Sequence, residues 1–162
     1  PATWLRALGL TVSHPRLRLG VVILSLATGP ALIGYGKSVS NVFCPSELQR
    51  YGGDVPYVRV FQAYSPEQKP NRRGRCFPAG HASGGFALMS TAVLACMRRG
   101  QVRGVLIGFA AGTVMGAYQM LKGAHFLSHT VTTALLCWLV VLFWVALAQK
   151  IERDKEEPKA ES

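Results

Sequence analysis

Charged residues are scarce in this chain, and acidic residues are the scarcest of them. Asp, Glu, Lys and Arg make up 16% of the 162 residues, against about 25% in ordinary soluble domains. None of the four occurs within residues 19–36, 76–97, 104–121 or 123–149. A helix needs about 20 mainly apolar residues to cross the hydrocarbon layer of a membrane. The lack of charge therefore excludes a water-soluble globule, a disordered chain and a small secreted disulfide scaffold, and it predicts an integral membrane protein.

The predicted fold is an all-α helical bundle with four visible transmembrane spans, at about residues 19–36, 78–97, 104–121 and 124–148. Residues 37–77 form a long polar connection rich in Pro and Gly, which are typical of loops. Residues 1–18 carry a short apolar patch around Trp4, Leu5 and Leu8, and we expect an interfacial or truncated N-terminal segment there. Residues 150–162 form a charged tail, so the single membrane domain is expected over residues 19–149.

The few charges present are mostly positive. Eighteen Lys and Arg residues oppose eight Asp and Glu residues, which gives a net charge of +10. They lie mainly between the apolar runs, so the expected partners are anionic membrane lipids and a phosphorylated lipid substrate, and nucleic acid is not expected. Basic residues in short loops mark the cytoplasmic side of a membrane. The turn with Arg98, Arg99 and Arg103, together with the tail, is therefore predicted to be cytoplasmic, and residues 37–77 lie on the opposite face.

Two of the four cysteines, Cys44 and Cys76, belong to this long connection. A disulfide between them would close a loop of about thirty residues and stabilise the fold by about 3 kcal/mol in the chain-entropy model. Such bonds persist in oxidising compartments, so the pairing would place the loop outside the cytoplasm. Two unrelated thiols remain the alternative.

Three of the four histidines and one lysine are predicted to meet at the loop end of the bundle. His81 lies near the start of the second span, and His125 and His129 lie one helical turn apart at the start of the fourth. Lys37 closes the first span on the same face. Ionisable residues at membrane depth are rare and mark functional sites. We therefore predict one anion-sized site lined by these four residues.

Three short motifs contain these residues, in this order: Lys37 with Cys44-Pro45, then Pro78-Ala79-Gly80-His81, then Tyr118-Gln119 with His125 and His129. In order, spacing and position at span ends they resemble the motifs of the membrane-bound type-2 phosphatidic acid phosphatases, relatives of the vanadium haloperoxidases. The resemblance covers roughly residues 19–148 and implies a membrane lipid phosphatase. That family usually has six spans, so two further spans are expected before residue 19 in the full-length protein.

The chain departs from the family pattern at four positions. Cys44 and Gln119 stand where the family has arginine, Ala79 where it has serine, and His129 where it has aspartate. Two phosphate-binding guanidinium groups and the carboxylate partner of the nucleophile are therefore missing from their family positions. Candidate replacements for the carboxylate lie in the long connection: Glu47, Asp54 and Glu67.

His125 is the expected nucleophile, because a neutral imidazole can attack phosphorus and form a phosphohistidine. His129, at i+4 on the same helix face, is expected to accept a hydrogen bond from His125 and so orient its ring. His81 is the expected general acid for the leaving group and later the base for water. Positive charge and N–H donors for the phosphoryl oxygens are expected from the following residues: Lys37, Ala79, Gly80, Ser83, Gln119, Lys122 and Arg75.

The expected substrate is a lipid phosphate monoester or pyrophosphate of the phosphatidylglycerophosphate, phosphatidate, undecaprenyl pyrophosphate or lipid A class. The expected location is a bacterial-type inner membrane with the site facing outward, and no cofactor or metal is expected. Three alternatives stay open. A lipid phosphotransferase would use the same phosphohistidine, a zinc-dependent membrane hydrolase would use the histidines as ligands, and an inactive binding protein would explain the four departures. Inhibition by vanadate favours the phosphatase, and sensitivity to chelators favours zinc.

Overall fold

A computed structural model describes residues 10–59 and 62–160 of the chain. The α-helices are α2 (Pro15–Ser40), α3 (Gly80–Ala87), α4 (Arg98–Leu121) and α5 (Leu127–Ala160). Short 3-10 helices are η1 (Pro45–Glu47), η2 (Gln49–Tyr51), η3 (Pro66–Gln68) and η4 (Leu88–Leu94). The described residues contain no β-strand beyond one isolated bridge between Leu48 and Val55. The predicted all-α class is therefore confirmed.

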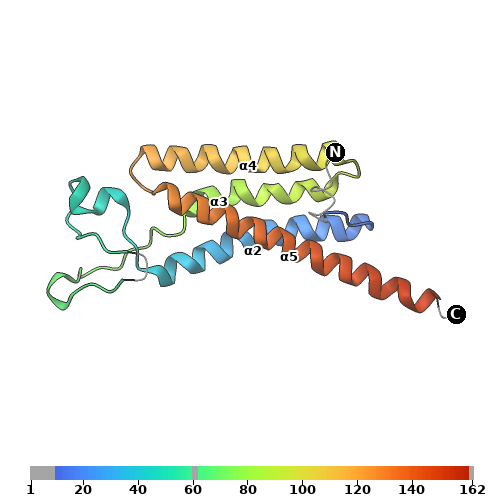
Figure 1. Cartoon of the computed structure of the whole chain (residues 1–162), viewed down its shortest axis with the longest axis horizontal. Coiled ribbons are helices and arrows are strands. Elements are labelled where there is room, and N and C mark those ends of the chain that lie inside the picture. The colour runs from blue at the N-terminus through green and yellow to red at the C-terminus, as the bar shows by residue number, and fades with distance from the viewer. Residues whose placement is uncertain (1–9, 60–61, 161–162) are drawn as a thin grey trace.

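The helices run back and forth along one axis as a bundle (Figure 1). α2 leads to a long excursion at one end, α3 and η4 return along α4, and α5 crosses α2 before running beyond the bundle to the C-terminus. Residues 41–79 form the excursion, and we call the end of the bundle that carries it the loop end. The connection between η4 and α4 lies at the other end, together with the arginines of the first turn of α4.

Three helical stretches are long and apolar enough to cross a membrane: Pro15–Glu47, Arg98–Leu121 and Leu127–Lys155. The predicted second span, 78–97, is not among these three, because helix α3 passes directly into the 3-10 helix η4 and the pair covers only 80–94. A 3-10 helix rises about 2.0 Å per residue, against 1.5 Å for an α-helix. The pair is therefore roughly 26 Å long, which is close to the hydrocarbon thickness of about 30 Å.

The helix limits differ from the predicted spans in ways that matter for the site. α2 continues past residue 36 to Ser40, so Lys37 lies within its last turn. α4 begins at Arg98, so the basic residues predicted to form a turn belong to the helix. α5 begins at Leu127 and not at residue 124, which leaves His125 in the link between α4 and α5.

Glycine at every fourth position of α4 allows η4, α3 and α5 to pack against it. Gly104, Gly108, Gly112 and Gly116 are all buried. An added Cβ would lie 2.2 Å from the backbone N of Met89 at Gly108, and 2.3 Å from the Phe86 ring at Gly112. Small residues allow this close approach of helix backbones, as the Gly and Ala content of this span predicts.

The first described residues and the part of α5 around Glu152 pack together at the far end of the bundle. Leu10 and Val12 are buried in one cluster with Val21 of α2 and Val141 of α5. Glu152 of α5 accepts hydrogen bonds of 2.7 Å from the backbone N–H groups of Ser13 and His14. The rest of the predicted N-terminal segment, residues 1–9 with Trp4, lies outside the described residues. The predicted tail continues helix α5 as far as Ala160.

A methyl group added at Gly108 is expected to push α4 away from η4. The variant Gly108→Ala should lower the free energy of unfolding by about 2 kcal/mol, because overpacking of a tight contact costs 1–3 kcal/mol. Gly34→Ala is the matched control, since a Cβ at Gly34 of α2 would meet nothing within 4 Å. The measurement is thermal or denaturant unfolding of both variants in detergent. Equal stability of the two variants would contradict the close packing of α4.

Candidate active site

A disulfide holds the excursion against the loop end of the bundle. Cys44 and Cys76 are bonded, with their Cα atoms 5.1 Å apart. Two backbone hydrogen bonds act beside it: Cys76 N–H donates to Val42 O at 2.8 Å, and Ser46 N–H donates to Gly123 O at 3.0 Å. The second bond attaches the excursion to the link between α4 and α5. The segment before α3, which contains Cys76, and the link that carries His125 are thus fixed to each other.

The sulfur of Cys76 lies 3.3 Å from the His125 ring nitrogen Nδ1. The same sulfur lies 2.7 Å from the carbonyl oxygen of Ala124. A disulfide sulfur carries no proton, so it can only accept a hydrogen bond. We therefore assign the proton of neutral His125 to Nδ1, which leaves the lone pair of Nε2 free for chemistry.

The second motif is fixed to the start of α5 by side-chain and backbone hydrogen bonds. Thr133 Oγ1 donates to the carbonyl of Ala79 at 3.1 Å and to that of His129 at 2.9 Å. Ala79 N–H donates to His129 O at 3.4 Å. Since Ala79 is the residue before α3, these contacts set the position of His81 in the first turn of α3 relative to His129 on α5.

The three imidazoles predicted to converge do so. The ring centroids of His81 and His125 are 6.5 Å apart, and those of His125 and His129 are 5.7 Å apart. His125 and His129 are buried, with 5% and 2% of their surface exposed, whereas His81 is exposed to solvent. His125 and His129 are therefore the buried members of the cluster, and His81 is its exposed member.

Lys37 reaches the same cluster from the last turn of α2. A Cβ on Gly80 would lie 3.1 Å from its ammonium nitrogen, so glycine at the start of α3 leaves room for the lysine. Burial, which has the largest effect, and the neighbouring charges of Lys37, His129 and His81 together lower the pKa of His125 to about 4. His125 is therefore neutral at the pH of most compartments, as a nucleophilic imidazole must be.

His129 does not make the contact expected of it. No hydrogen bond joins His125 and His129 among the described residues, and Nδ1 of His129 is buried without a hydrogen-bond partner. The rings of Phe77 and Phe126 pack edge-on against His129, with centroids 5.2 and 5.3 Å away. In place of the expected contact with His129, Nδ1 of His125 lies beside the Cys76 sulfur.

Four other predicted residues make different contacts. The Ser83 hydroxyl donates to Gly80 O at 2.6 Å, within the first turn of α3. The Lys122 ammonium lies over the ring of Tyr118, 5.4 Å from its centroid. Gln119 is buried in α4, and Arg75 is exposed on the excursion. Of the residues predicted to bind phosphate, Lys37 and the Ala79–Gly80 turn are the ones brought beside the histidines.

The loop carboxylates considered as partners for His125 are engaged elsewhere. Arg72 pairs with Asp54 at 2.7 Å and with Glu47 at 3.6 Å. Glu47 also accepts a hydrogen bond from Cys44 N–H at 2.8 Å. Glu67, in η3, is exposed. Within the part of the chain that the structure describes, the histidine cluster has no recorded carboxylate contact.

One group of possible metal ligands overlaps the cluster. Cys76, His125 and His129 bring one candidate ligand atom each within 4.8 Å of one another. A cysteine binds metal as a thiolate, and Cys76 is held in the disulfide. Two imidazoles of this group remain, and the third imidazole of the cluster, His81, is not among the grouped ligand atoms, which leaves one fewer than the three protein ligands of a typical catalytic zinc site. The donor set therefore does not fit zinc while the disulfide is intact.

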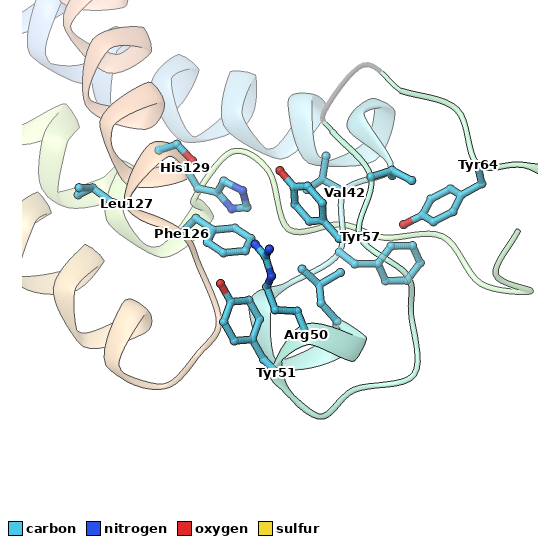
Figure 2. A pocket seen from close by; sticks show the side chains of 12 residues that line it. Val42, Arg50, Tyr51, Tyr57, Tyr64, Phe126, Leu127 and His129 are labelled. Carbon is cyan, nitrogen blue, oxygen red and sulfur yellow. The ribbon is translucent and has the colours of Figure 1, made fainter. Parts of the chain in front are cut away.

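A pocket of about 350 Å³ adjoins the cluster on the side of His129 (Figure 2). The excursion and the start of α5 form its walls, which carry Tyr51, Tyr57, Tyr64, Phe126 and the cationic side chain of Arg50. Sequence reasoning missed Arg50, Cys76 as a neighbour of His125, and Thr133. The sequence could have indicated Thr133 by its i+4 spacing from His129. The placement of Arg50 and Cys76 depends on how the excursion folds.

A family model described as PAP2 superfamily matches residues 18–153, which is most of the chain. The matched range contains all three motifs and thereby confirms the family resemblance of the sequence. No curated protein and no solved structure matches the chain.

Removal of the lysine charge is expected to raise the pKa of His125. In Lys37→Met the pKa should move up from about 4 toward the ordinary value near 6.5, because the ammonium disfavours the imidazolium. The measurement is an NMR titration of histidine-labelled protein in detergent. Lys122→Met is the matched control, since its ammonium lies over Tyr118. An unshifted His125 in Lys37→Met would show that Lys37 does not act on the ring.

Proposed function

Since the chain belongs to the PAP2 superfamily, whose members are generally phosphatases, we propose that it is a membrane lipid phosphatase. It removes phosphate from a phosphorylated or pyrophosphorylated lipid through a phosphohistidine on His125. The substrate tail stays in the bilayer while its headgroup enters the loop end of the bundle. The three long apolar helices support a lipid-borne substrate.

The observation that carries this proposal is the convergence of Lys37 with three imidazoles, from four separate segments that include α5, which carries His129. Lys37 comes from α2, His81 from α3, and His125 from the link before α5. An ammonium beside neutral imidazoles attracts a phosphate and leaves a nucleophile free to react with it. A packing role alone gives no reason to gather these groups next to a glycine turn.

In the first step, Nε2 of His125 attacks phosphorus. The N–P bond forms as the bond between phosphorus and the leaving oxygen breaks, and His81 gives that oxygen a proton. The 6.5 Å between the two ring centroids leaves space for a phosphoryl group between them. Lys37 and the first N–H groups of α3 neutralise charge on the phosphoryl oxygens.

In the second step, water attacks the phosphohistidine. His81, now unprotonated, takes a proton from the water as the new O–P bond forms and the N–P bond breaks. Inorganic phosphate leaves, and neutral His125 is restored. The solvent exposure of His81 supports this role, since water reaches the cluster from that side.

We propose the outer face of a bacterial-type cytoplasmic membrane as the place of reaction. The Cys44–Cys76 disulfide at the loop end supports an oxidising compartment there. At the other end, α4 begins with Arg98 and Arg99, which supports a cytoplasmic location for that end.

His125→Ala is expected to abolish phosphate release, because it removes the atom that bonds to phosphorus. The assay is phosphate release by purified protein in detergent from phosphatidylglycerophosphate, phosphatidate, undecaprenyl pyrophosphate and lipid A. His14→Ala is the matched control, since His14 lies at the start of α2 on the far end of the bundle. Near-normal turnover by folded His125→Ala would exclude the mechanism.

The value of kcat/KM is expected to fall on the acid side when the pH drops through about 4. His125 reacts only when it is neutral, and its pKa is lowered to about 4, so the reactive form is kept as the pH drops through 6 and 5. Below pH 4 the ring is protonated and has no lone pair for attack. In Lys37→Met, the remaining activity should be lost at a higher pH than in the wild type, because the pKa of His125 is then higher. A wild-type limb near pH 6.5 would contradict a buried, neutral His125.

A further inference from the structure

Arg50 is a cation without an acidic partner in the described structure. It lies in η2 and lines the pocket beside His129, which we call the loop pocket. Figure 2 shows its side chain extending into the pocket from the wall of the excursion, toward the side on which His129 lies. No ion pair or cation–π contact of Arg50 is recorded among residues 10–59 and 62–160.

The nearby acids of the excursion are satisfied by another arginine. Arg72 pairs with both Asp54 and Glu47 and lies over the ring of Phe43. Arg50 is therefore surplus positive charge at a concave surface. A guanidinium is suited to bind phosphate through two parallel hydrogen bonds, so the loop pocket fits an anionic group.

The rim of the loop pocket is apolar and exposed. Leu127, Tyr51 and Tyr57 have 64%, 55% and 56% of their surface exposed. Leu127 is the first residue of α5, at the end of a helix that is long enough to span the membrane. Aromatic residues at span ends belong to the membrane–water interface. The loop pocket therefore opens at the depth where a lipid joins its headgroup.

Two cationic points thus lie beside members of the histidine cluster. Lys37 contacts the Gly80 turn beside His81 and His125, whereas Arg50 stands in the loop pocket on the side of His129. A single phosphate at His125 uses the first point and leaves the second unpaired. A headgroup with two phosphates in series uses both.

We propose that Arg50 binds the tail-side phosphate of a substrate whose headgroup carries two phosphates, and so makes the enzyme select lipid diphosphates over lipid monophosphates. This inference rests on the proposed phosphatase function. The terminal phosphoryl group lies at His125 and Lys37, and the phosphate next to the tail lies at Arg50. Arg50 is thereby a specificity-determining residue.

The test compares diacylglycerol monophosphate with diacylglycerol diphosphate of identical acyl chains, and a second pair on one isoprenoid tail. Phosphate release is measured in detergent for wild type, Arg50→Gln, Arg50→Lys and Arg59→Gln. The last is the matched control, because Arg59 belongs to the same excursion and is exposed, yet it does not line the loop pocket. Unfolding temperatures of all four proteins establish that each is folded.

Wild type is expected to prefer the diphosphate, and Arg50→Gln to lose about tenfold of that preference, since a hydrogen-bonded ion pair is worth a factor of this size. The loss should appear in KM for the diphosphate. Arg50→Lys should keep part of the preference, because it retains the charge without the planar fork, and Arg59→Gln should keep all of it.

Equal kcat/KM of wild type for both lipids would overturn the inference and leave the phosphatase standing. An equal loss of kcat/KM on both lipids in Arg50→Gln would also overturn it. The same loss of preference in Arg59→Gln would overturn it as well. If Arg50→Gln does not fold, inhibition of Arg50→Lys by inorganic pyrophosphate and by phosphate decides. The inference then requires that Arg50→Lys weakens inhibition by pyrophosphate more than inhibition by phosphate, relative to wild type. Absence of phosphate release from every lipid by wild type would overturn the proposed function and the inference together.

Discussion

The disulfide between Cys44 and Cys76 is the constraint on which the loop end of this protein depends. It joins the chain that follows α2 to the chain that precedes α3, and its sulfur lies 3.3 Å from the ring of His125. The disulfide therefore fixes the two ends of the excursion to each other, and the hydrogen bond from Ser46 N–H to Gly123 O attaches the excursion to the link before α5. The orientation of His125, the proposed nucleophile, and the walls of the loop pocket both depend on the excursion that this disulfide holds. A polar segment of this length on a small bundle would otherwise have many arrangements.

The electrostatics of the site differ from a histidine held by a carboxylate. A carboxylate partner would favour the imidazolium and raise the pKa of the ring. Here burial and Lys37 both disfavour the charged form of His125, whose pKa is lowered to about 4. The departure from aspartate to histidine at position 129 thus favours a free-base nucleophile. Phosphate brings negative charge of its own, which compensates Lys37 when the substrate is bound.

Much of the architecture follows from where charges are missing. Long uncharged runs predict membrane helices, and their alternating direction predicts that Lys37, His81 and His125 meet at one end. The same reasoning fails in the excursion, whose positions depend on contacts between distant residues. The ring of His125 contacts Cys76 and not His129, because this contact depends on how the excursion folds. Lys122 and Ser83 were expected at the phosphate, but a local ring contact and a helix-turn hydrogen bond hold them elsewhere.

Packing and chemistry divide the molecule between rigid and adaptable parts. The glycine face of α4 lets α3 and η4 approach closely, and Thr133 of α5 bonds to the residue just before α3. His81 therefore stands on a helix that packs directly against α4 and α5, and Lys37 stands on α2, whose Gly29 lies close to Ala87 of α3. Arg50 stands on an excursion fixed by one disulfide and a few hydrogen bonds. A substitution in the excursion can change which headgroup fits without moving the reacting groups, because the two sets of residues rest on different supports.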